Sequence, residues 1–397
     1  MKRFLALMLA LCMVFALCAC GGNTQPQGED EQQGGEEVAY KVAMVTDYGD
    51  ITDQSFNQTT YEACKAYCDA NGVDFKYYKP TDDSTAARVE MIEMAVAEGY
   101  NVVVMPGYAF AGAIAQVQDQ YADVKFIGLD VSEFDLFDSF YNHDDQGNQT
   151  DLIDPANEPH VASNVYCAVY QEELCGYMAG YAAVKLGYEK LGFLGGMAVP
   201  AVIRYGFGFV QGANAAAAEL DKQVEINYVY GGQFFGDADI TAKMDTWYSA
   251  GTEVVFACGG GIFTSAAEAA AKVDGGKVIG VDVDQAAIID GGYGEGMTVT
   301  SAMKGLAATV NTMLSEIVAG NWDNYGGKIA TLGLVSKVPA ENYVQIAPST
   351  QFGEGFQQTD YEALVAAMFA GDIVVSSDIA AMPAVTNATV NDQGQIK

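Results

Sequence analysis

The stretch Asn101–Asp130 (NVVVMPGYAFAGAIAQVQDQYADVKFIGLD) decides the fold, because it holds two short apolar strands separated by one helix. The runs at Asn101–Met105 and Lys125–Asp130 have the length of strands and lack the period of a helix. Ala109–Gln120, between them, is rich in alanine and reads as a helix. Continuous apolar strands joined through helices are typical of a parallel sheet that is covered on both faces.

The same alternation extends along most of the chain and breaks once, at the long acidic segment Ser132–Asn164, which exceeds an ordinary connection. The other predicted strands are Lys41–Thr46, Val73–Tyr78, Lys190–Leu194, Glu225–Tyr230, Glu253–Cys258, Lys277–Asp282, Lys328–Val335 and Tyr343–Ile346. The other predicted helices are Ser55–Ala70, Ser84–Glu98, Gln171–Leu186, Arg204–Leu220, Asp237–Ala250, Ile262–Val273, Ser301–Ala319 and Tyr361–Ala370. This order predicts an α/β protein with two doubly wound parallel sheets of similar size.

The amino-terminal end carries an export signal. Lys2 and Arg3 precede an apolar run that ends at Leu17, and Cys20 follows shortly after. This arrangement resembles the lipobox of bacterial lipoproteins, in which the cysteine becomes the first mature residue and carries the lipid. We therefore expect residues 1–19 to be a lipoprotein signal peptide, and residues 20–38, rich in Gly, Gln and Glu, to be a flexible linker to the membrane.

Composition narrows the partners. The chain has 52 Asp and Glu against 19 Lys and Arg, so a nucleic acid partner is disfavoured, because phosphate binding needs basic patches. A length of 397 residues suits two lobes better than one core. The sequence has no second long apolar run, so it predicts no transmembrane helix.

Catalytic and metal motifs are missing from the sequence. The two histidines, His143 and His160, both lie in the acidic segment, and there is no HExxH, no CxxC and no Ser-His-Asp order. The sequence therefore favours a protein that is not an enzyme and holds neither a cofactor nor a metal. The disulfide state stays open for the five cysteines that follow Cys20, which are Cys64, Cys68, Cys167, Cys175 and Cys258.

Most predicted strands are followed by Asp or Gly. Ligands of open parallel sheets bind beyond the carboxyl ends of the strands, where glycine allows a close backbone approach and aspartate accepts hydrogen bonds. Asp and Gly are also the ordinary residues of turns, so any single position has a structural explanation. The positions are Asp47, Gly107, Asp130, Gly195, Gly196, Gly231, Gly232, Gly259, Gly260, Gly261, Asp282 and Asp284.

Several motifs resemble the basic membrane protein (PnrA-like) family of ABC-transporter substrate-binding lipoproteins. They are Thr46–Gln58 (TDYGDITDQSFNQ), Phe193–Met197 (FLGGM) with Pro200, Val278–Gln285 (VIGVDVDQ) and Ser301–Lys304 (SAMK). The resemblance extends over about Tyr40–Ala319 and implies two lobes joined by a hinge, as in type I periplasmic binding proteins. It also implies a monomer that captures a small molecule, a purine nucleoside in the best understood branch, for a permease and an ATPase.

The family positions imply a role for each site residue. Phe56 would stack on the base, and Asn57 and Asp130 would bind its polar edge. Asp47 and Asp282 would accept hydrogen bonds from ribose hydroxyls, and Lys304 would donate a hydrogen bond to the sugar. Backbone groups at Gly107 and Gly231 would line the site. Phe263 would cover the opposite face of the base, with Phe207 and Phe235 as alternatives.

On this resemblance we expect residues 39–164 to form lobe 1 and residues 165–284 lobe 2. Residues 285–325 would return to lobe 1 and residues 326–397 to lobe 2, with crossings near Asn164, Asp284 and Tyr325. Two alternatives stay open at this point: a receptor of the same fold for a simple sugar or a signal molecule, and a lipoprotein sensor that does not transport.

Overall fold

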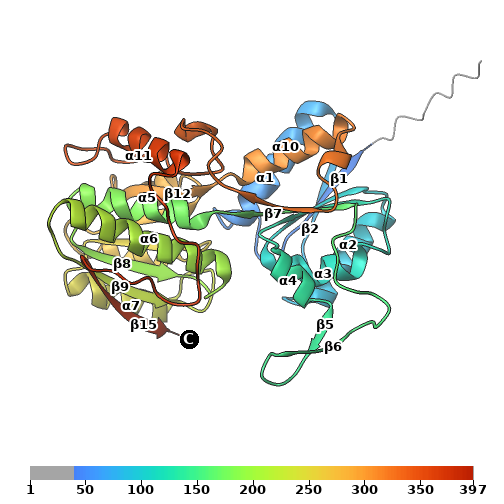
Figure 1. The fold of residues 1–397 in the computed structure, drawn as a ribbon, viewed down its shortest axis with the longest axis horizontal. Helices are drawn as coiled ribbons and strands as arrows, with labels where there is room; N and C mark the ends of the chain where they lie inside the picture. Colours follow the sequence, from blue (N-terminus) through green and yellow to red (C-terminus); the bar gives the residue numbers. More distant parts are fainter. Residues whose placement is uncertain (1–39, 397) are drawn as a thin grey trace, which may run out of the picture. The chain divides into compact units, whose positions relative to one another are not determined.

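The computed structural model describes residues 40–396, so Cys20 and the ranges expected to be signal peptide and linker lie outside the described residues. Residues Tyr40–Lys397 form one compact unit. Its first sheet, which contains β1, β2 and β7 on the right in Figure 1, is entirely parallel. Its six strands lie in the order β13-β7-β4-β3-β1-β2. These strands are β1 (Lys41–Val45), β2 (Asp74–Tyr78), β3 (Val102–Pro106), β4 (Lys125–Leu129), β7 (Val165–Tyr170) and β13 (Lys328–Leu332).

The second sheet has seven strands in the order β14-β12-β11-β10-β8-β9-β15, of which only β14 is antiparallel to its neighbour. They are β8 (Lys190–Gly195), β9 (Val224–Tyr230), β10 (Val254–Cys258), β11 (Lys277–Asp282), β12 (Thr298–Lys304), β14 (Val344–Ile346) and β15 (Ala388–Gln395). We call the first sheet with its helices the first lobe, and the second sheet with its helices the second lobe. The predicted class, two doubly wound parallel sheets, is confirmed.

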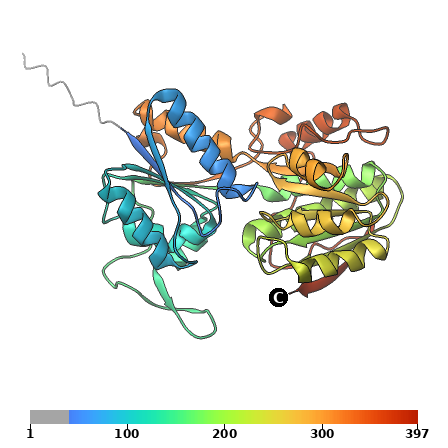
Figure 2. The ribbon, with the colours of Figure 1, turned by 180° about the vertical axis from the view of Figure 1, so that it is seen from behind.

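Helices cover both faces of each sheet, which explains why strands such as VVVMP of β3 are buried throughout. In the first lobe α1 (Phe56–Asn71) and α10 (Leu306–Val318) pack on one face, opposite α2 (Thr85–Ala97), α3 (Ala111–Val117) and α4 (Glu133–Asp138). In the second lobe α5 (Glu172–Lys185) and α6 (Pro200–Glu219) oppose α7 (Ala238–Ser249), α8 (Phe263–Ala270) and α9 (Ala286–Tyr293). The latter three are the yellow helices of Figure 2. The remaining helix is α11 (Gln358–Ala370), and the 3-10 turns are η1 (Tyr108–Phe110), η2 (Trp322–Asn324) and η3 (Pro339–Glu341).

Small residues bring α5 and α6 unusually close together. A Cβ on Gly176 would lie 2.2 Å from the carbonyl oxygen of Tyr205, and one on Gly212 would lie 2.0 Å from that of Tyr177. Any larger side chain would therefore push the helices apart. This packing fixes the first turn of α5 and the start of α6, both of which contribute charged residues to the site described below.

The acidic segment Ser132–Asn164 is an insertion in the first lobe. Ser132 and Asp135 form a capping box that begins α4, and β5 (Tyr141–His143) pairs antiparallel with β6 (Gln149–Leu152). Figure 1 shows this hairpin projecting away from the first sheet.

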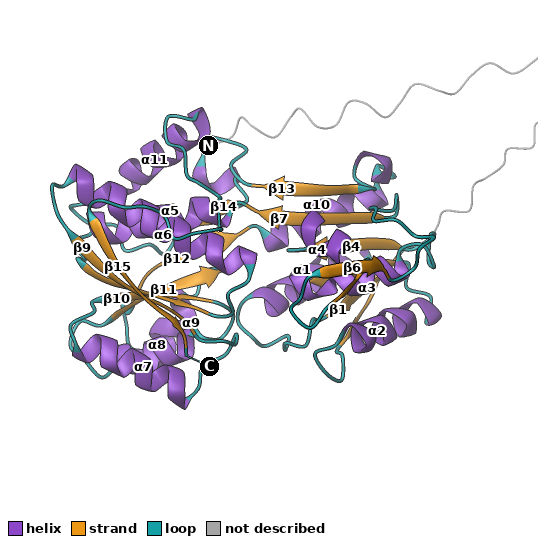
Figure 3. Ribbon diagram, turned by 60° about the horizontal axis from the view of Figure 1, so that its bottom comes forward, coloured by secondary structure: helices purple, strands orange, loops and turns teal. Residues whose placement is uncertain are grey.

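The predicted lobe boundaries need correction at three places. β7 lies in the first sheet, so the first crossing follows Tyr170 rather than Asn164. β12 stays in the second sheet, so the second crossing is at Gly305 rather than Asp284. The third crossing follows Leu332 rather than Tyr325, because β13 still pairs with β7, beside which it lies in Figure 3.

Local sequence explains the largest of these errors. We predicted a helix from Ser301, but residues 298–304 form β12 and the helix α10 begins only at Leu306. The segment TVTSAMK opens with β-branched residues, which favour a strand. The structure also contains elements that we did not predict: α4, β5 and β6 within the acidic segment, and β7, α9 and β15 outside it.

Candidate functional site

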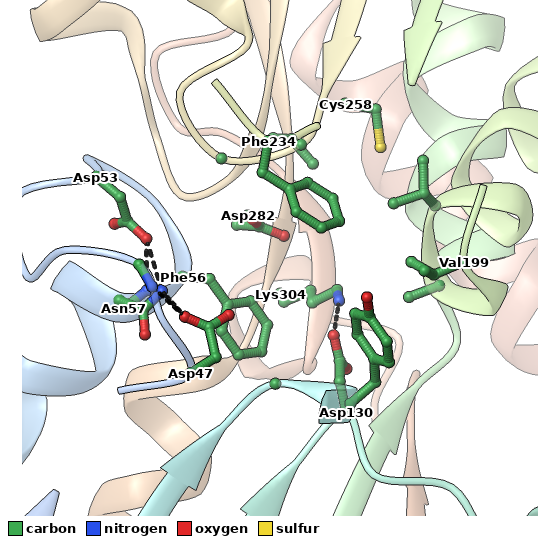
Figure 4. A pocket seen from close by; sticks show the side chains of 18 of the residues that line it. Asp47, Asp53, Phe56, Asn57, Asp130, Val199, Phe234, Cys258, Asp282 and Lys304 are labelled. Atoms are coloured by element: carbon green, nitrogen blue, oxygen red, sulfur yellow. Dashed lines mark hydrogen bonds and ion pairs between the residues drawn. The ribbon is translucent and has the colours of Figure 1, made fainter. Parts of the chain in front are cut away.

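A pocket of about 340 Å³ lies between the lobes, where the carboxyl ends of strands from both sheets meet. Its volume is in the range of sites for small molecules. Figure 4 shows side chains from both lobes pointing into it. Of the predicted site residues, those that line it are Asp47, Phe56, Asn57, Gly107, Asp130, Asp282 and Lys304.

Two aspartates occupy equivalent places in the two lobes. Asp130 directly follows β4, and Asp282 ends β11. Both adopt a left-handed backbone conformation, with φ of 62° and 63°. That conformation is uncommon for a residue with a side chain, although aspartate tolerates it better than most, and such strain gathers at functional sites.

Lys304 stands at the centre of a buried chain of alternating charges. Its Nζ lies 2.5 Å from Oδ2 of Asp130 and 3.1 Å from Oε1 of Glu172. The other carboxylate oxygen of Glu172 accepts a hydrogen bond from Nε of Arg204 at 2.6 Å. Asp130 belongs to the first lobe, while Lys304 ends β12 of the second, so this ion pair crosses between the lobes.

Aromatic rings complete the surroundings of Lys304. Its Nζ lies 5.1 Å from the ring centre of Phe56, 5.4 Å from that of Tyr205 and 5.6 Å from that of Tyr170. A cation over aromatic faces is stabilised by the quadrupoles of the rings. Burial lowers the pKa of this amine, but the carboxylates of Asp130, Glu172 and Asp282 outweigh it and raise the pKa. Lys304 is therefore a protonated donor at neutral pH.

The motif around Asp53 builds the other wall. The Asp53 carboxylate accepts backbone N–H groups of Ser55, Asn57 and Gln58, and so satisfies the amino-terminal end of α1. The Asn57 side chain then donates to Oδ2 of Asp53 at 3.1 Å and to Oδ1 of Asp47 at 3.2 Å. Both donor positions of the Asn57 amide are thus directed at carboxylates, as Figure 4 shows.

Two buried acceptors on the pocket wall have no hydrogen-bond partner within residues 40–396: Oδ1 of Asn57 and Oδ1 of Asp130. A buried acceptor without a partner costs about 1–3 kcal/mol. A ligand that places N–H or O–H groups against these atoms would recover that energy. Burial is also the largest cause that raises the pKa of Asp47, Asp130 and Asp282.

The ring that lies across the pocket from Phe56 is that of Phe234, which the sequence did not indicate as a site residue. Figure 4 shows Phe56 and Phe234 on opposite sides of the pocket, one from each lobe. The Phe234 ring lies close to Gly196, where a Cβ would be 2.5 Å from its Cδ1. Gly196, directly after β8, is therefore needed to admit this ring.

Two predicted site residues are misplaced. Phe263, the first residue of α8, is buried in the core of the second lobe rather than lining the pocket. Gly231 packs against Ile262 and Ile240 and does not line the pocket. Of the alternatives to Phe263, Phe235 lines the pocket, whereas Phe207 is buried in the core.

The charged residues Arg204 and Glu172 were also not assigned to the site. Glu172 and Glu173 open α5, which is otherwise largely apolar, and both are buried. Two adjacent acidic residues at the start of a buried helix are the sequence signal that could have indicated a buried ion pair. The other residues that line the pocket are Tyr48, Gly49, Asp50, Thr52, Asp53, Tyr108, Ser132, Asp135, Val169, Val199, Pro200, Ala201, Val202, Tyr205, Cys258, Gly259, Gly260, Gly261 and Val281.

The part of the chain that the structure describes has five cysteines, all buried and unpaired. No cluster of three or more His, Cys, Asp or Glu side chains in that part is arranged to hold a metal ion. None of the helices in residues 40–396 combines the length and the apolar character that a membrane span requires.

Most of the chain matches the model of a known protein family. The model of the Bmp family, described as ABC transporter substrate-binding protein PnrA-like, matches residues 40–346. The chain belongs to this family. It is therefore a substrate-binding protein of an ABC transporter, with a small molecule as ligand and a permease and an ATPase as partners. The PnrA-like resemblance inferred from the motifs is confirmed.

Named relatives of this PnrA-like protein span most of its length. The ABC transporter nucleoside-binding protein BmpA of Lactococcus lactis is 24% identical over 350 residues, covering 84% of this chain and 89% of the relative. The CD4+ T-cell-stimulating antigen of Listeria innocua is 27% identical, covering 82% and 87%. An uncharacterized lipoprotein of Pyrococcus furiosus is 25% identical, covering 88% and 79%. Proteins of the family act outside the cytoplasm, and these relatives are named as binding proteins, antigens or lipoproteins rather than enzymes.

Solved structures support the fold. An ABC transporter solute-binding protein of Conexibacter woesei has a TM-score of 0.63 at 21% identity, covering 85% of this chain and 99% of that one. One from Aeropyrum pernix has a TM-score of 0.61 at 20% identity, covering 84% and 87%. The fold of this PnrA-like protein is that of type I periplasmic binding proteins.

Proposed function

We propose that this protein captures a purine nucleoside in the pocket between its lobes and presents it to the permease of an ABC importer. The relative from Lactococcus lactis is named as a nucleoside-binding protein, which supports this ligand class. The motion would be a hinge closure about the three crossings between the lobes.

The observation that carries the proposal is the pair of rings Phe56 and Phe234 on opposite sides of the pocket, beside unpartnered acceptors of Asn57 and Asp130. A flat base would stack between the two rings, at about 1–3 kcal/mol for each stacking contact. Its polar edge would donate to the two acceptors. A simple sugar would leave at least one of the rings without a planar partner.

The remaining polar groups suit a ribose. Asp47 and Asp282 would accept from hydroxyls, Lys304 would donate to the sugar, and the backbone at Gly107 would lie against it. A buried carboxylate that loses its hydroxyl partner costs about 1–3 kcal/mol, so free bases would bind more weakly than nucleosides.

We further propose that residues 1–19 are removed as a signal peptide, that Cys20 carries lipid, and that residues 20–38 link the monomeric binding unit to the membrane. Metabolic labelling with a radioactive fatty acid tests the anchor. Wild-type protein should incorporate label and Cys20→Ala should not; equal labelling of both would contradict the anchor.

The ligand class is tested by thermal melting with purine and pyrimidine nucleosides, free bases and ribose. A ligand at one hundred times its Kd stabilises the protein by about 2.7 kcal/mol, which raises the melting temperature by several degrees. We expect this from guanosine, inosine or adenosine and not from ribose, and we expect Phe234→Ala to reduce it. Stabilisation by ribose alone would overturn the nucleoside proposal in favour of a sugar.

A further inference from the structure

The two lobes are joined beside the pocket by hydrogen bonds that involve neither the Lys304 ion pair nor the chain crossings. Ser55 of the first lobe donates from Oγ to Oδ2 of Asp282 in the second lobe at 2.6 Å, and this contact is buried. Nearby, Nε2 of Gln285 donates to the carbonyl oxygen of Gln54 at 3.2 Å. Gln54 and Ser55 directly precede α1 of the first lobe, whereas Asp282 ends β11 of the second lobe and Gln285 follows it, so both hydrogen bonds join the lobes.

The Ser55 hydroxyl is available for this contact because another side chain caps α1. It occupies the N-cap position of α1, where a serine side chain ordinarily accepts a hydrogen bond from its own helix, yet it makes no such bond. The Asp53 carboxylate instead accepts the amides of Ser55, Asn57 and Gln58. The hydroxyl of Ser55 is therefore available to donate across the cleft.

The second-lobe residues that accept or donate these hydrogen bonds, Asp282 and Gln285, are also held in place. Asp282 is held in its left-handed conformation, and within residues 40–396 its second oxygen, Oδ1, accepts only a long hydrogen bond of 3.4 Å from the Tyr205 hydroxyl. Gln285 is anchored within its own lobe, because its Oε1 accepts from the amide of Val281 at 2.9 Å. Bonding of Oδ2 by Ser55 thus leaves Oδ1 as the oxygen of Asp282 with spare capacity toward the pocket.

We infer that Ser55 is a positioning residue for ligand capture: by bonding Oδ2 of Asp282 when the lobes meet, it orients this carboxylate and stabilises the closed arrangement. The inference rests on the proposed function, since it adds to the same site a residue that does not line the pocket. Ligand binding by Asp282 of the second lobe would then depend on closure, because only closure brings Ser55 of the first lobe against this carboxylate.

The charges around Asp282 support this role. Burial is the largest cause and raises the pKa of Asp282, with smaller increases from the carboxylates of Asp53 and Glu172, whereas Lys304 and the Ser55 hydroxyl lower it by favouring the ionised form. The other titratable groups facing it are Asp130, Tyr205 and Cys258. Removing the Ser55 hydroxyl removes a hydrogen bond to the charged form, so the pKa of Asp282 would rise further.

The test compares Ser55→Ala with the matched control Ser349→Ala. Ser349 donates to Asp284 at the same distance, 2.6 Å, but at an exposed position two residues beyond Asp282. Calorimetric titration with guanosine or inosine from pH 4 to 8 should show at least about tenfold weaker binding for Ser55→Ala, and a loss of affinity on acidification that begins at a higher pH. The control should match the wild type in both respects. Equal affinity and an equal pH profile for Ser55→Ala would overturn the inference, as would the same loss in the control.

A second readout separates this inference from the nucleoside proposal. Spin labels on cysteines introduced at Glu90 of α2 and Ala242 of α7, both exposed, report the distance between the lobes without any ligand assumption. Ser55→Ala should shift the distance distribution toward longer values relative to the wild type and Ser349→Ala. If no nucleoside binds the wild type, the nucleoside proposal fails while this shift still supports the contact; identical distributions would overturn the inference.

Discussion

Glu172 offers the sharpest test of the electrostatic account, through the substitution Glu172→Gln. Its carboxylate is fully buried between Nε of Arg204 at 2.6 Å and Nζ of Lys304 at 3.1 Å. The amide has nearly the same shape, so the substitution removes charge without opening a cavity. Arg204 and Lys304 would then share only the charge of Asp130 and more distant groups.

The expected cost follows from this geometry. Breaking a buried ion pair by removing one partner costs about 3–5 kcal/mol, because the other charge stays buried. The glutamine oxygen can still accept one hydrogen bond, which places the expected loss at the lower end, about 3 kcal/mol. The melting temperature should fall by roughly 5 °C or more.

The adjacent residue supplies a matched control, Glu173→Gln. Glu173 is also buried in the first turn of α5, but its Oε2 has no hydrogen-bond partner in residues 40–396, and burial raises its pKa to about 7. When folding raises the pKa of a carboxylate, the protein loses stability as the pH rises from the ordinary pKa of that group to the raised one. Glu173→Gln should therefore match the wild type near pH 4 and exceed it in stability at pH 8.

Urea denaturation of the three proteins at pH 8, followed by tryptophan fluorescence, measures both effects. We expect Glu172→Gln to unfold at lower urea than the wild type and Glu173→Gln at higher urea. A Glu172→Gln protein whose free energy of unfolding lies within about 1 kcal/mol of the wild-type value would refute the view that this carboxylate anchors Lys304 and Arg204.

Three further outcomes are expected. Phe234→Ala should weaken nucleoside binding by about 10- to 100-fold, measured by titration calorimetry. Phe263→Ala should instead lower the free energy of unfolding by about 3–5 kcal/mol, measured by thermal melting, because it empties a core position. Because burial raises the pKa of Asp47 and Asp282, affinity should decline on acidification at pH values above the ordinary carboxyl range, and a flat titration profile would contradict this. Burial also raises the pKa of the Cys258 thiol well above its usual value, so this pocket residue should react slowly with a maleimide and more slowly still with ligand present; rapid labelling unaffected by ligand would be inconsistent with its place in the pocket wall.

The alternation of short apolar strands and helices predicted both sheets because each strand is covered on both faces and so lacks a polar side. The elements missed lie where that signal fails. β7 follows directly on an irregular insertion, and β15 carries the polar sequence ATVNDQGQ at the edge of the second sheet. Their pairing depends on neighbours far away in the chain, which local sequence does not encode.

For the site, the motifs predicted the aspartates at or just after the ends of β1, β4 and β11, because strand ends converge at one edge of each sheet. The motifs did not predict which aromatic side chain faces the pocket, because the conformation of a long loop determines it. Phe234, not Phe263, faces the pocket, because Gly196 leaves space for its ring while α8 turns Phe263 into the core. Buried pairs such as Glu172 with Arg204 also arise from helix packing that spacing alone does not reveal.

The central claim is that a base stacks between one aromatic ring from each lobe, and ultraviolet difference absorbance tests it most directly. Titration of inosine with the protein should reduce absorbance of the base through stacking, with one-to-one saturation, and the Phe56→Ala and Phe234→Ala variants should each diminish the change. Saturable binding of inosine with no change in base absorbance, or with a change that both variants preserve, would contradict the account.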